Sequence, residues 1–316
     1  MKSLKDIKIV FFGTPEFAVA SLDALLKAGA DIAAVVTMPD KPAGRGHKLL
    51  HSDVKKYALA HDLPLLQPVK LRDPEFVDVL RAINADLFIV IAFRMLPEVV
   101  WSMPPMGTFN LHASLLPAYR GAAPINRAVM DGCTRTGVTT FLLKHEIDTG
   151  DILSQRAIEI LPEDCVGDVH DRLMEIGAEE VVKTVEMLAA GTARPIPQPE
   201  GEHVAAPKIF KEDCRIDWSR PAREIHNQVR GLSPYPAAFC EIEDDGGKQF
   251  TAKILATAIA DDNDGHRPGE AFREGKRLMV GTGSDQAIEI VTLQPAGKKA
   301  MPMQAFLAGY NPVKFF

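Results

Sequence analysis

Residues 7–36, IKIVFFGTPEFAVASLDALLKAGADIAAVV, carry the pattern of a strand, a helix and a second strand. The apolar run at 8–12 predicts a buried strand. Residues 17–27 have the apolar spacing of a helix that stops at Gly29, and 32–36 form a second apolar run. Strands joined by one crossover helix run parallel. The segment therefore predicts an α/β fold built on a parallel sheet.

The same alternation of elements continues to about residue 190. Residues 87–93, LFIVIAF, are the most apolar run in the chain and are the predicted central strand. Further strands are expected at 64–66, 137–143 and 152–160, and an extended run that holds Asn110 and His112 is expected to form another. Further helices are expected at 52–61, 74–83, 123–130 and 168–190. An N-terminal domain over residues 1–191 accommodates all of them.

The composition then changes. Residues 192–207 contain Pro195, Pro197, Pro199 and Pro207 and few large apolar side chains, which predicts an extended linker. The C-terminal domain, residues 208–316, begins with a helix expected over 221–230. Short β-rich runs separated by Gly and Asp turns follow it, and they favour a small OB-like β-barrel.

The bulk composition bounds the function. With 316 residues the chain is long enough for two cores, and its net charge of −6 argues against binding nucleic acid by overall attraction. Residues 39–56 nevertheless hold five basic side chains against two acidic ones, which is a local basic patch. The four cysteines are widely spaced and indicate neither a zinc cage nor a disulfide framework. We expect a cytoplasmic protein with no membrane span.

Two polar clusters follow predicted strands. Residues 107–121 read GTFNLHASLLPAYRG, and a strand would point Asn110 and His112 to one face. Residues 145–151, HEIDTGD, follow the strand at 137–143. If both strands are parallel their ends meet at one edge, where Asp148 could orient His112. These three side chains suit addition of a nucleophile to a carbonyl, with Asn and protonated His holding the oxyanion.

Other interpretations of these residues stay open. Asn110 could cap a turn, and His112 could be satisfied by backbone. The His and Asp side chains here include metal ligand types, but they lack metal-binding spacing. Ser114 lacks the Gly-x-Ser-x-Gly setting of a nucleophile and fits a structural turn. Arg120, Lys298 and Lys299 could contact phosphates or be solvated charges.

Residues 37–50 have prolines and glycines that argue against any regular element. They follow the second strand, at the edge of an α/β sheet where ligands bind. A solvated loop and a ligand-binding loop fit this pattern equally well.

The motif at residues 110–117, Asn-x-His-x-Ser-Leu-Leu-Pro, with Arg-Gly at 120–121 and Asp-Thr-Gly-Asp at 148–151, resembles the formyltransferases that use 10-formyltetrahydrofolate. The resemblance covers nearly the whole chain. Four further stretches carry it: FGTP at 12–15, PDKPAGRG at 39–46, RGAAPI at 120–125 and QPAGKKAM at 294–301.

This resemblance implies a Rossmann-like parallel-sheet N-terminal domain joined to an OB-like C-terminal domain, in a monomeric enzyme without a metal. It also implies transfer of the formyl group from 10-formyltetrahydrofolate to the α-amino group of initiator methionyl-tRNA. Asn110 and His112 would hold the tetrahedral intermediate, and Asp148 would assist proton transfer.

Binding residues are implied in the same way. The implied folate site consists of Phe93, Ser114, Leu115, Leu116, Pro117 and Asp148. The implied tRNA contacts are Lys41, Arg45, Lys48, Lys298 and Lys299. One departure from the family pattern is the sequence FRMLP at 93–97, where the family usually has an aromatic-Gly pair.

Three other functions compete. A sugar-nucleotide N-formyltransferase would share the Asn-His-Asp site but present a different amine. A non-catalytic RNA-binding module would use the basic loop and the barrel. A dinucleotide dehydrogenase is disfavoured because the Gly-x-Gly-x-x-Gly fingerprint is missing.

Overall fold

The computed structural model describes residues 3–43 and 48–316, which form two compact units. The N-terminal unit comprises residues 1–121, 137–158 and 171–205, and the C-terminal unit comprises 122–136, 159–170 and 206–316. The domain limits expected at residues 191 and 208 stay a prediction.

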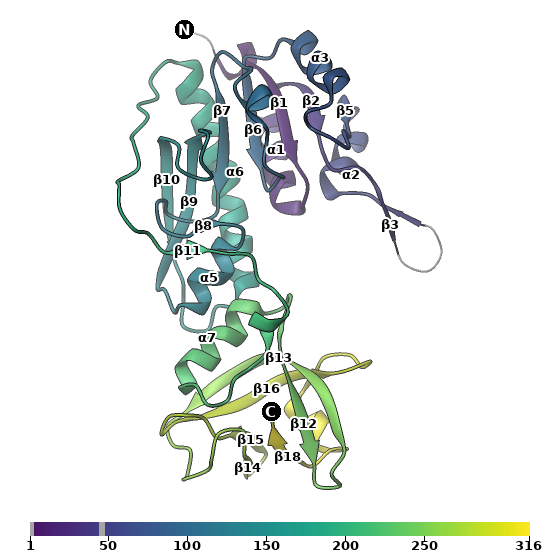
Figure 1. The fold of residues 1–316 in the computed structure, drawn as a ribbon, viewed down its shortest axis with the longest axis vertical. Helices are drawn as coiled ribbons and strands as arrows, with labels where there is room; N and C mark the ends of the chain where they lie inside the picture. Colours follow the sequence, from purple (N-terminus) through teal and green to yellow (C-terminus); the bar gives the residue numbers. More distant parts are fainter. Residues whose placement is uncertain (1–2, 44–47) are drawn as a thin grey trace. The chain divides into compact units, whose positions relative to one another are not determined.

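A twisted sheet organises the N-terminal unit (Figure 1). Within the described residues it has seven strands in the order β10-β9-β7-β6-β1-β2-β5. Their bounds are β1 Lys8–Gly13, β2 Asp31–Val36, β5 Leu65–Leu66, β6 Leu87–Ile91, β7 Thr108–His112, β9 Arg135–Leu142 and β10 Ile152–Glu159. The five neighbouring strands β7, β6, β1, β2 and β5 run parallel. The predicted α/β class and the central position of β6 are therefore confirmed.

Helices accompany the strands of this unit. They are η1 Leu4–Asp6, α1 Glu16–Lys27, α2 Asp53–Ala60, α3 Pro74–Ile83, α4 Glu98–Trp101 and α6 Val166–Ala189. Helix α3 matches the prediction because the Asp73 carboxylate accepts the Glu75 N–H, Pro74 starts the helix and Asn84 ends it with φ +50°. The core beneath α3 includes Leu80 and the tilted pair Phe12–Phe88, with ring centroids 5.3 Å apart.

We expected no regular structure in residues 37–50. For the part of this segment that the structure describes, the prediction was wrong. Strands β3 Lys41–Ala43 and β4 Lys48–Leu50 pair antiparallel as a hairpin. They form a sheet of their own. Pro42 lacks an N–H and is tolerated there because, among the described residues, no further strand pairs with β3. Arg45 lies outside the described residues.

The C-terminal unit contains an antiparallel sheet (Figure 1). Its strand order is β14-β15-β16-β13-β12-β18, and β17 pairs with β16. Its strands are β12 Ala238–Asp244, β13 Gln249–Ala260, β14 Ala271–Glu274, β15 Arg277–Val280, β16 Ala287–Pro295, β17 Met301–Pro302 and β18 Pro312–Phe315. A bridge between Glu270 and Lys314 links the two edges, so the sheet closes as a small barrel. This confirms the expected second β domain.

The remaining elements are α5 Pro124–Met130, β8 Arg120–Gly121, β11 Ala205–Ala206, η2 Glu212–Cys214, α7 Ala222–Leu232 and α8 Met303–Leu307. Helix α7 packs its apolar side on the barrel core, where Ile225 and Val229 are buried together with Phe306. Across the part of the chain that the structure describes, no helix combines the length and apolar character that a membrane span requires.

A buried histidine should make the stability of the C-terminal unit depend on pH. The Nδ1 atom of His226 on α7 lies 3.0 Å from the Thr257 hydroxyl, and burial lowers the pKa of the ring below its ordinary 6.5, with Arg230 adding to the effect. The folded state therefore prefers the neutral ring, whereas the unfolded chain binds a proton below about pH 6.5. The stabilisation is present above that pH and is lost as the pH falls below it.

We expect the free energy of unfolding, measured by urea denaturation between pH 5 and 8, to fall on the acid side. The variant His226→Gln should show a smaller acid loss. An identical loss in wild type and variant would contradict this assignment.

Candidate active site

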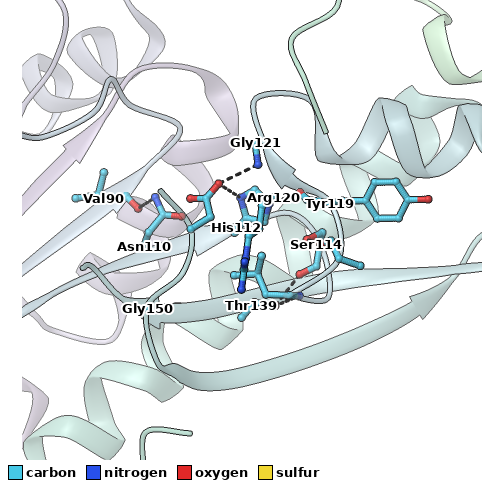
Figure 2. A network of polar contacts seen from close by, with 12 residues as sticks. Val90, Asn110, His112, Ser114, Tyr119, Arg120, Gly121, Thr139 and Gly150 are labelled. Atoms are coloured by element: carbon cyan, nitrogen blue, oxygen red, sulfur yellow. Dashed lines mark hydrogen bonds and ion pairs between the residues drawn. The ribbon is translucent and has the colours of Figure 1, made fainter. Parts of the chain in front are cut away.

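Strand β7 presents Asn110 and His112 on one side, as the alternation of side chains along a strand requires. Asn110 is in register with Val90 of the neighbouring strand β6, and its Nδ2 donates to the Val90 carbonyl at 2.9 Å (Figure 2). This bond fixes the plane of the amide. Because an amide nitrogen carries two hydrogens, one donor is left to meet an oxygen of a bound substrate.

The His112 ring is buried, and the tautomer of its neutral form follows from its hydrogen bond with Tyr119. The Nε2 atom lies 2.8 Å from the Tyr119 carbonyl oxygen. A carbonyl only accepts, so Nε2 carries a hydrogen and Nδ1 is the basic nitrogen of the neutral ring. Nδ1 lies 3.9 Å from Asp148 Oδ2. The ring can therefore take a proton on the side that faces the carboxylate.

Asp148 reaches His112 by a different route from the one expected. We expected β7 and the strand before Asp148 to run parallel, but β9 is antiparallel to β7, and His112 pairs with Thr139. The end of β9 consequently lies beside the start of β7. The loop 143–151 brings Asp148 to His112, with Asp148 in the left-handed region at φ +56° and its Oδ2 accepting the Gly121 N–H at 3.0 Å.

The other polar groups of this loop do not join the site. His145 is 86% exposed and lies 3.9 Å from a Glu98 carboxylate oxygen, and Asp151 pairs with Lys144 at 2.7 Å. Among the residues that the structure describes, no group of three or more His, Cys, Asp or Glu side chains is placed to hold a metal ion.

The turn after β7 is fixed by its own hydrogen bonds. The buried Ser114 donates through Oγ to the Ala118 carbonyl at 2.6 Å, and its own carbonyl accepts from the Thr139 hydroxyl at 2.7 Å. Leu116 is buried, whereas Leu115 and Pro117 are half-buried. The structural interpretation of Ser114 fits these bonds, and a role of residues 114–117 in folate binding stays a prediction.

A cavity follows β6 and was not predicted from the sequence. It has a volume of about 340 Å³ and is lined by residues 69–72 and 94–97. Arg94 shapes it by donating to the carbonyls of Pro68 and, at 2.7 Å, of Val69, and burial lowers the pKa of its guanidinium. The half-buried Phe93 ring lies 5.8 Å from the Phe12 ring. The sequence departs from the family pattern at 93–97, which overlaps the lining of this cavity, but that departure did not predict a cavity.

The basic residues implied for tRNA binding lie in both units. Lys41 and Lys299 are exposed, and the Nζ of Lys298 lies 2.7 Å from the Tyr310 hydroxyl and 5.0 Å from the centre of its ring. The Arg45 assignment and the side chain of Lys48 fall outside the described residues.

Arg120 was left open between a phosphate contact and a solvated charge, and the structure gives it a protein partner. Its Nε and Nη2 donate to Oε1 of Gln198 at 3.1 and 2.6 Å. Sequence reasoning missed Gln198 because it lies within the proline-rich segment 192–207. No spacing in the sequence connects two residues that are 78 positions apart.

The chain belongs to the formyl transferase family. The family model "Formyl transferase" matches residues 7–185, and "Formyl transferase, C-terminal domain" matches residues 208–311. Methionyl-tRNA formyltransferase of Bacteroides fragilis is 50% identical over 316 residues, which cover 99% of this chain and 98% of the relative. The enzyme of the same name from Flavobacterium johnsoniae is 45% identical over 307 residues, 97% of each chain.

Solved structures share the fold. The N-formyltransferase from Helicobacter canadensis, in complex with folinic acid and dTDP-3-aminofucose, superposes with a TM-score of 0.66 at 19% identity, covering 92% of this chain and 99% of that one. HypX from Aquifex aeolicus, in complex with tetrahydrofolic acid, has a TM-score of 0.63 at 20% identity and covers 96% of this chain and 47% of that one.

Proposed function

We propose that this chain transfers the formyl group of 10-formyltetrahydrofolate to the α-amino group of initiator methionyl-tRNA. The observation that carries the proposal is that Asn110 and His112 share one face of β7 while Asp148 Oδ2 lies 3.9 Å from His112 Nδ1. Membership of the formyl transferase family and full-length relatives named methionyl-tRNA formyltransferase support it. We further propose that the protein works as a cytoplasmic monomer.

The reaction begins when the lone pair of the neutral amine attacks the formyl carbon. The carbonyl electrons move to oxygen, and the oxyanion is met by the second N–H of Asn110 and, once protonated, by His112. The attack forms the new C–N bond and gives a tetrahedral intermediate. When the carbonyl re-forms, the bond from carbon to the folate nitrogen breaks, and that nitrogen takes up the proton that His112 has removed from the amine. The products are formylmethionyl-tRNA and tetrahydrofolate.

Proton removal from the amine falls to His112. An α-amino group with an ordinary pKa near ~8 is mostly protonated at neutral pH, so the site must favour its neutral form. The Nδ1 atom of His112 is the available base, and Asp148 at 3.9 Å stabilises the ring after it has taken the proton. The gap between the two atoms exceeds a hydrogen bond, which leaves room for a water or a substrate group to bridge them.

We place the folate beside the cavity lined by 69–72 and 94–97, with Phe93 and the turn at 114–117 as its further contacts. The half-buried ring of Phe93 and the half-buried Leu115 and Pro117 offer apolar surface to an aromatic co-substrate.

A discriminating experiment offers the purified protein 10-formyltetrahydrofolate with either charged initiator tRNA or an amino-sugar nucleotide. We expect formylation of methionyl-tRNA only, detected by acid gel electrophoresis of the tRNA. Formylation of the sugar nucleotide alone would replace this function by the alternative N-formyltransferase. Tight tRNA binding without any transfer would favour an RNA-binding module.

We propose that Lys41, Arg45 and Lys48 contact phosphates of the tRNA, together with Lys298 and Lys299 of the C-terminal unit. The basic excess at 39–56 supports this. Arg45→Ala should weaken tRNA binding and reduce the slope of log affinity against log salt by about one unit, because one fewer counterion is released. Titrations of wild type and variant across salt concentrations measure it. A variant that binds more weakly with an unchanged slope would show that Arg45 does not neutralise a phosphate.

A further inference from the structure

Gln198 is partly buried and lies in the segment 192–207, which the sequence predicts to be a linker. Both the oxygen and the nitrogen of its amide group form hydrogen bonds. Its Oε1 accepts two N–H groups of Arg120, and its Nε2 donates to the carbonyls of Asp148 and Gly150, each at 2.8 Å. A carboxamide has two acceptor lone pairs and two donor hydrogens. All four are matched here, so the orientation of this side chain is fixed.

The two carbonyls belong to the most constrained part of the loop 143–151. Asp148 has a left-handed backbone, which a residue with a side chain adopts at an energetic cost. A Cβ at Gly150 would lie 1.5 Å from the Leu142 carbonyl oxygen, so the loop is pressed against β9 there. Gln198 bonds on either side of Thr149 and holds the backbone in this conformation.

The same short segment also holds the Asp148 side chain. Gly121 donates its N–H to Asp148 Oδ2 at 3.0 Å, while its neighbour Arg120 binds Gln198. Asp148 is therefore fixed at its carboxylate by Gly121 and at its backbone by Gln198. That same carboxylate oxygen is the one 3.9 Å from Nδ1 of His112.

We propose that Gln198 is a positioning residue for formyl transfer, which keeps the Asp148 carboxylate facing His112. This inference rests on the proposed function. Within the described residues, the hydrogen bonds of Gln198 join it to Arg120 and to the backbone of the Asp148 loop, so it acts through Asp148.

Two variants test whether Gln198 holds the Asp148 loop in place or only attaches the 192–207 segment to Arg120. Gln198→Ala removes every bond. Gln198→Glu keeps an oxygen for the Arg120 guanidinium but sets a second oxygen against two carbonyl oxygens, so the bonds to Asp148 and Gly150 are lost. The matched control is Gln228→Ala, because Gln228 donates in the same way to the carbonyls of Asp213 and Arg215, both at 2.9 Å, within the C-terminal unit.

The first readout needs no activity. The Gly121 amide is protected by the Asp148 carboxylate, and Gln198 does not touch it directly. We expect hydrogen exchange at Gly121, followed by NMR, to become about tenfold faster in both Gln198 variants and to stay unchanged in Gln228→Ala. Unchanged exchange at Gly121 in Gln198→Ala would overturn the proposal.

The second readout is a double-mutant cycle on formyl transfer. Gln198→Ala and Gln198→Glu should lower kcat by up to about 100-fold, with KM for methionyl-tRNA nearly unchanged. In the Asp148→Asn background, adding Gln198→Ala should have little further effect on kcat. An equal loss in both backgrounds would overturn the proposal and make Gln198 merely structural. If the wild-type protein transfers no formyl group, the proposed function fails, and exchange at Gly121 still decides whether Gln198 holds Asp148.

Discussion

Replacing Asn110 by alanine is expected to lower the rate of formyl transfer by roughly 10²–10³, the usual cost of one oxyanion donor. The bond to the Val90 carbonyl holds the Asn110 amide so that its second N–H can meet the developing charge. The loss should appear in kcat, because the charge on the formyl oxygen exists in the transition state and not in the bound 10-formyltetrahydrofolate. Single-turnover rates with saturating enzyme, alongside tRNA affinity, measure both quantities.

The matched control for this variant is Asn126→Ala. The Nδ2 of Asn126 donates to the Gly231 carbonyl at 2.8 Å within the C-terminal unit, which is the same kind of side chain to backbone bond as at Asn110. Its loss should cost some stability and leave the transfer rate close to that of the wild type. Wild-type turnover in Asn110→Ala would remove Asn110 from the mechanism, and a parallel loss of tRNA affinity would assign it to binding.

Replacing His112 by alanine is expected to lower the rate at neutral pH by about 10²–10⁴, the range that a positioned acid–base group supplies. The deficit should narrow as the pH rises through ~8, because more of the substrate amine is then already neutral. A pH–rate profile of wild type and His112→Ala tests this.

His145→Ala is the control for the histidine variant, since the ring of His145 is 86% exposed and its carboxylate neighbour is Glu98. It should show the rate and the pH profile of the wild type. A constant ratio between wild type and His112→Ala across the whole pH range would mean that His112 does not take the amine proton.

Much of the fold followed from patterns that span only a few residues. The bounds of α3 match because Asp73, Pro74 and Asn84 are local start and stop signals. The β1-α1-β2 unit and the buried strand β6 follow from the spacing of apolar side chains. The motif around Asn110 and His112 was visible for the same reason, since two residues of one strand share a face without help from the rest of the chain.

The direction of β9 was not visible in this way, because an apolar strand of the same composition can pair in either direction. Because β9 is antiparallel to β7, the 143–151 loop starts beside the first residues of β7. We had expected it to start beside the end of β7, where His112 lies. The loop compensates by carrying the carboxylate back to His112, held by Gly121.

What the sequence determined by itself is therefore the α/β class, the order of most elements and the small second β domain. It also predicted the three polar residues of the candidate site. Tertiary structure alone decided how those three meet, where the cavity behind Arg94 opens, and that Arg120 binds Gln198 across 78 positions of the chain. The physical reason is range: periodicity and capping act within a few residues, whereas a hydrogen bond between distant segments exists only after the chain between them has taken its path.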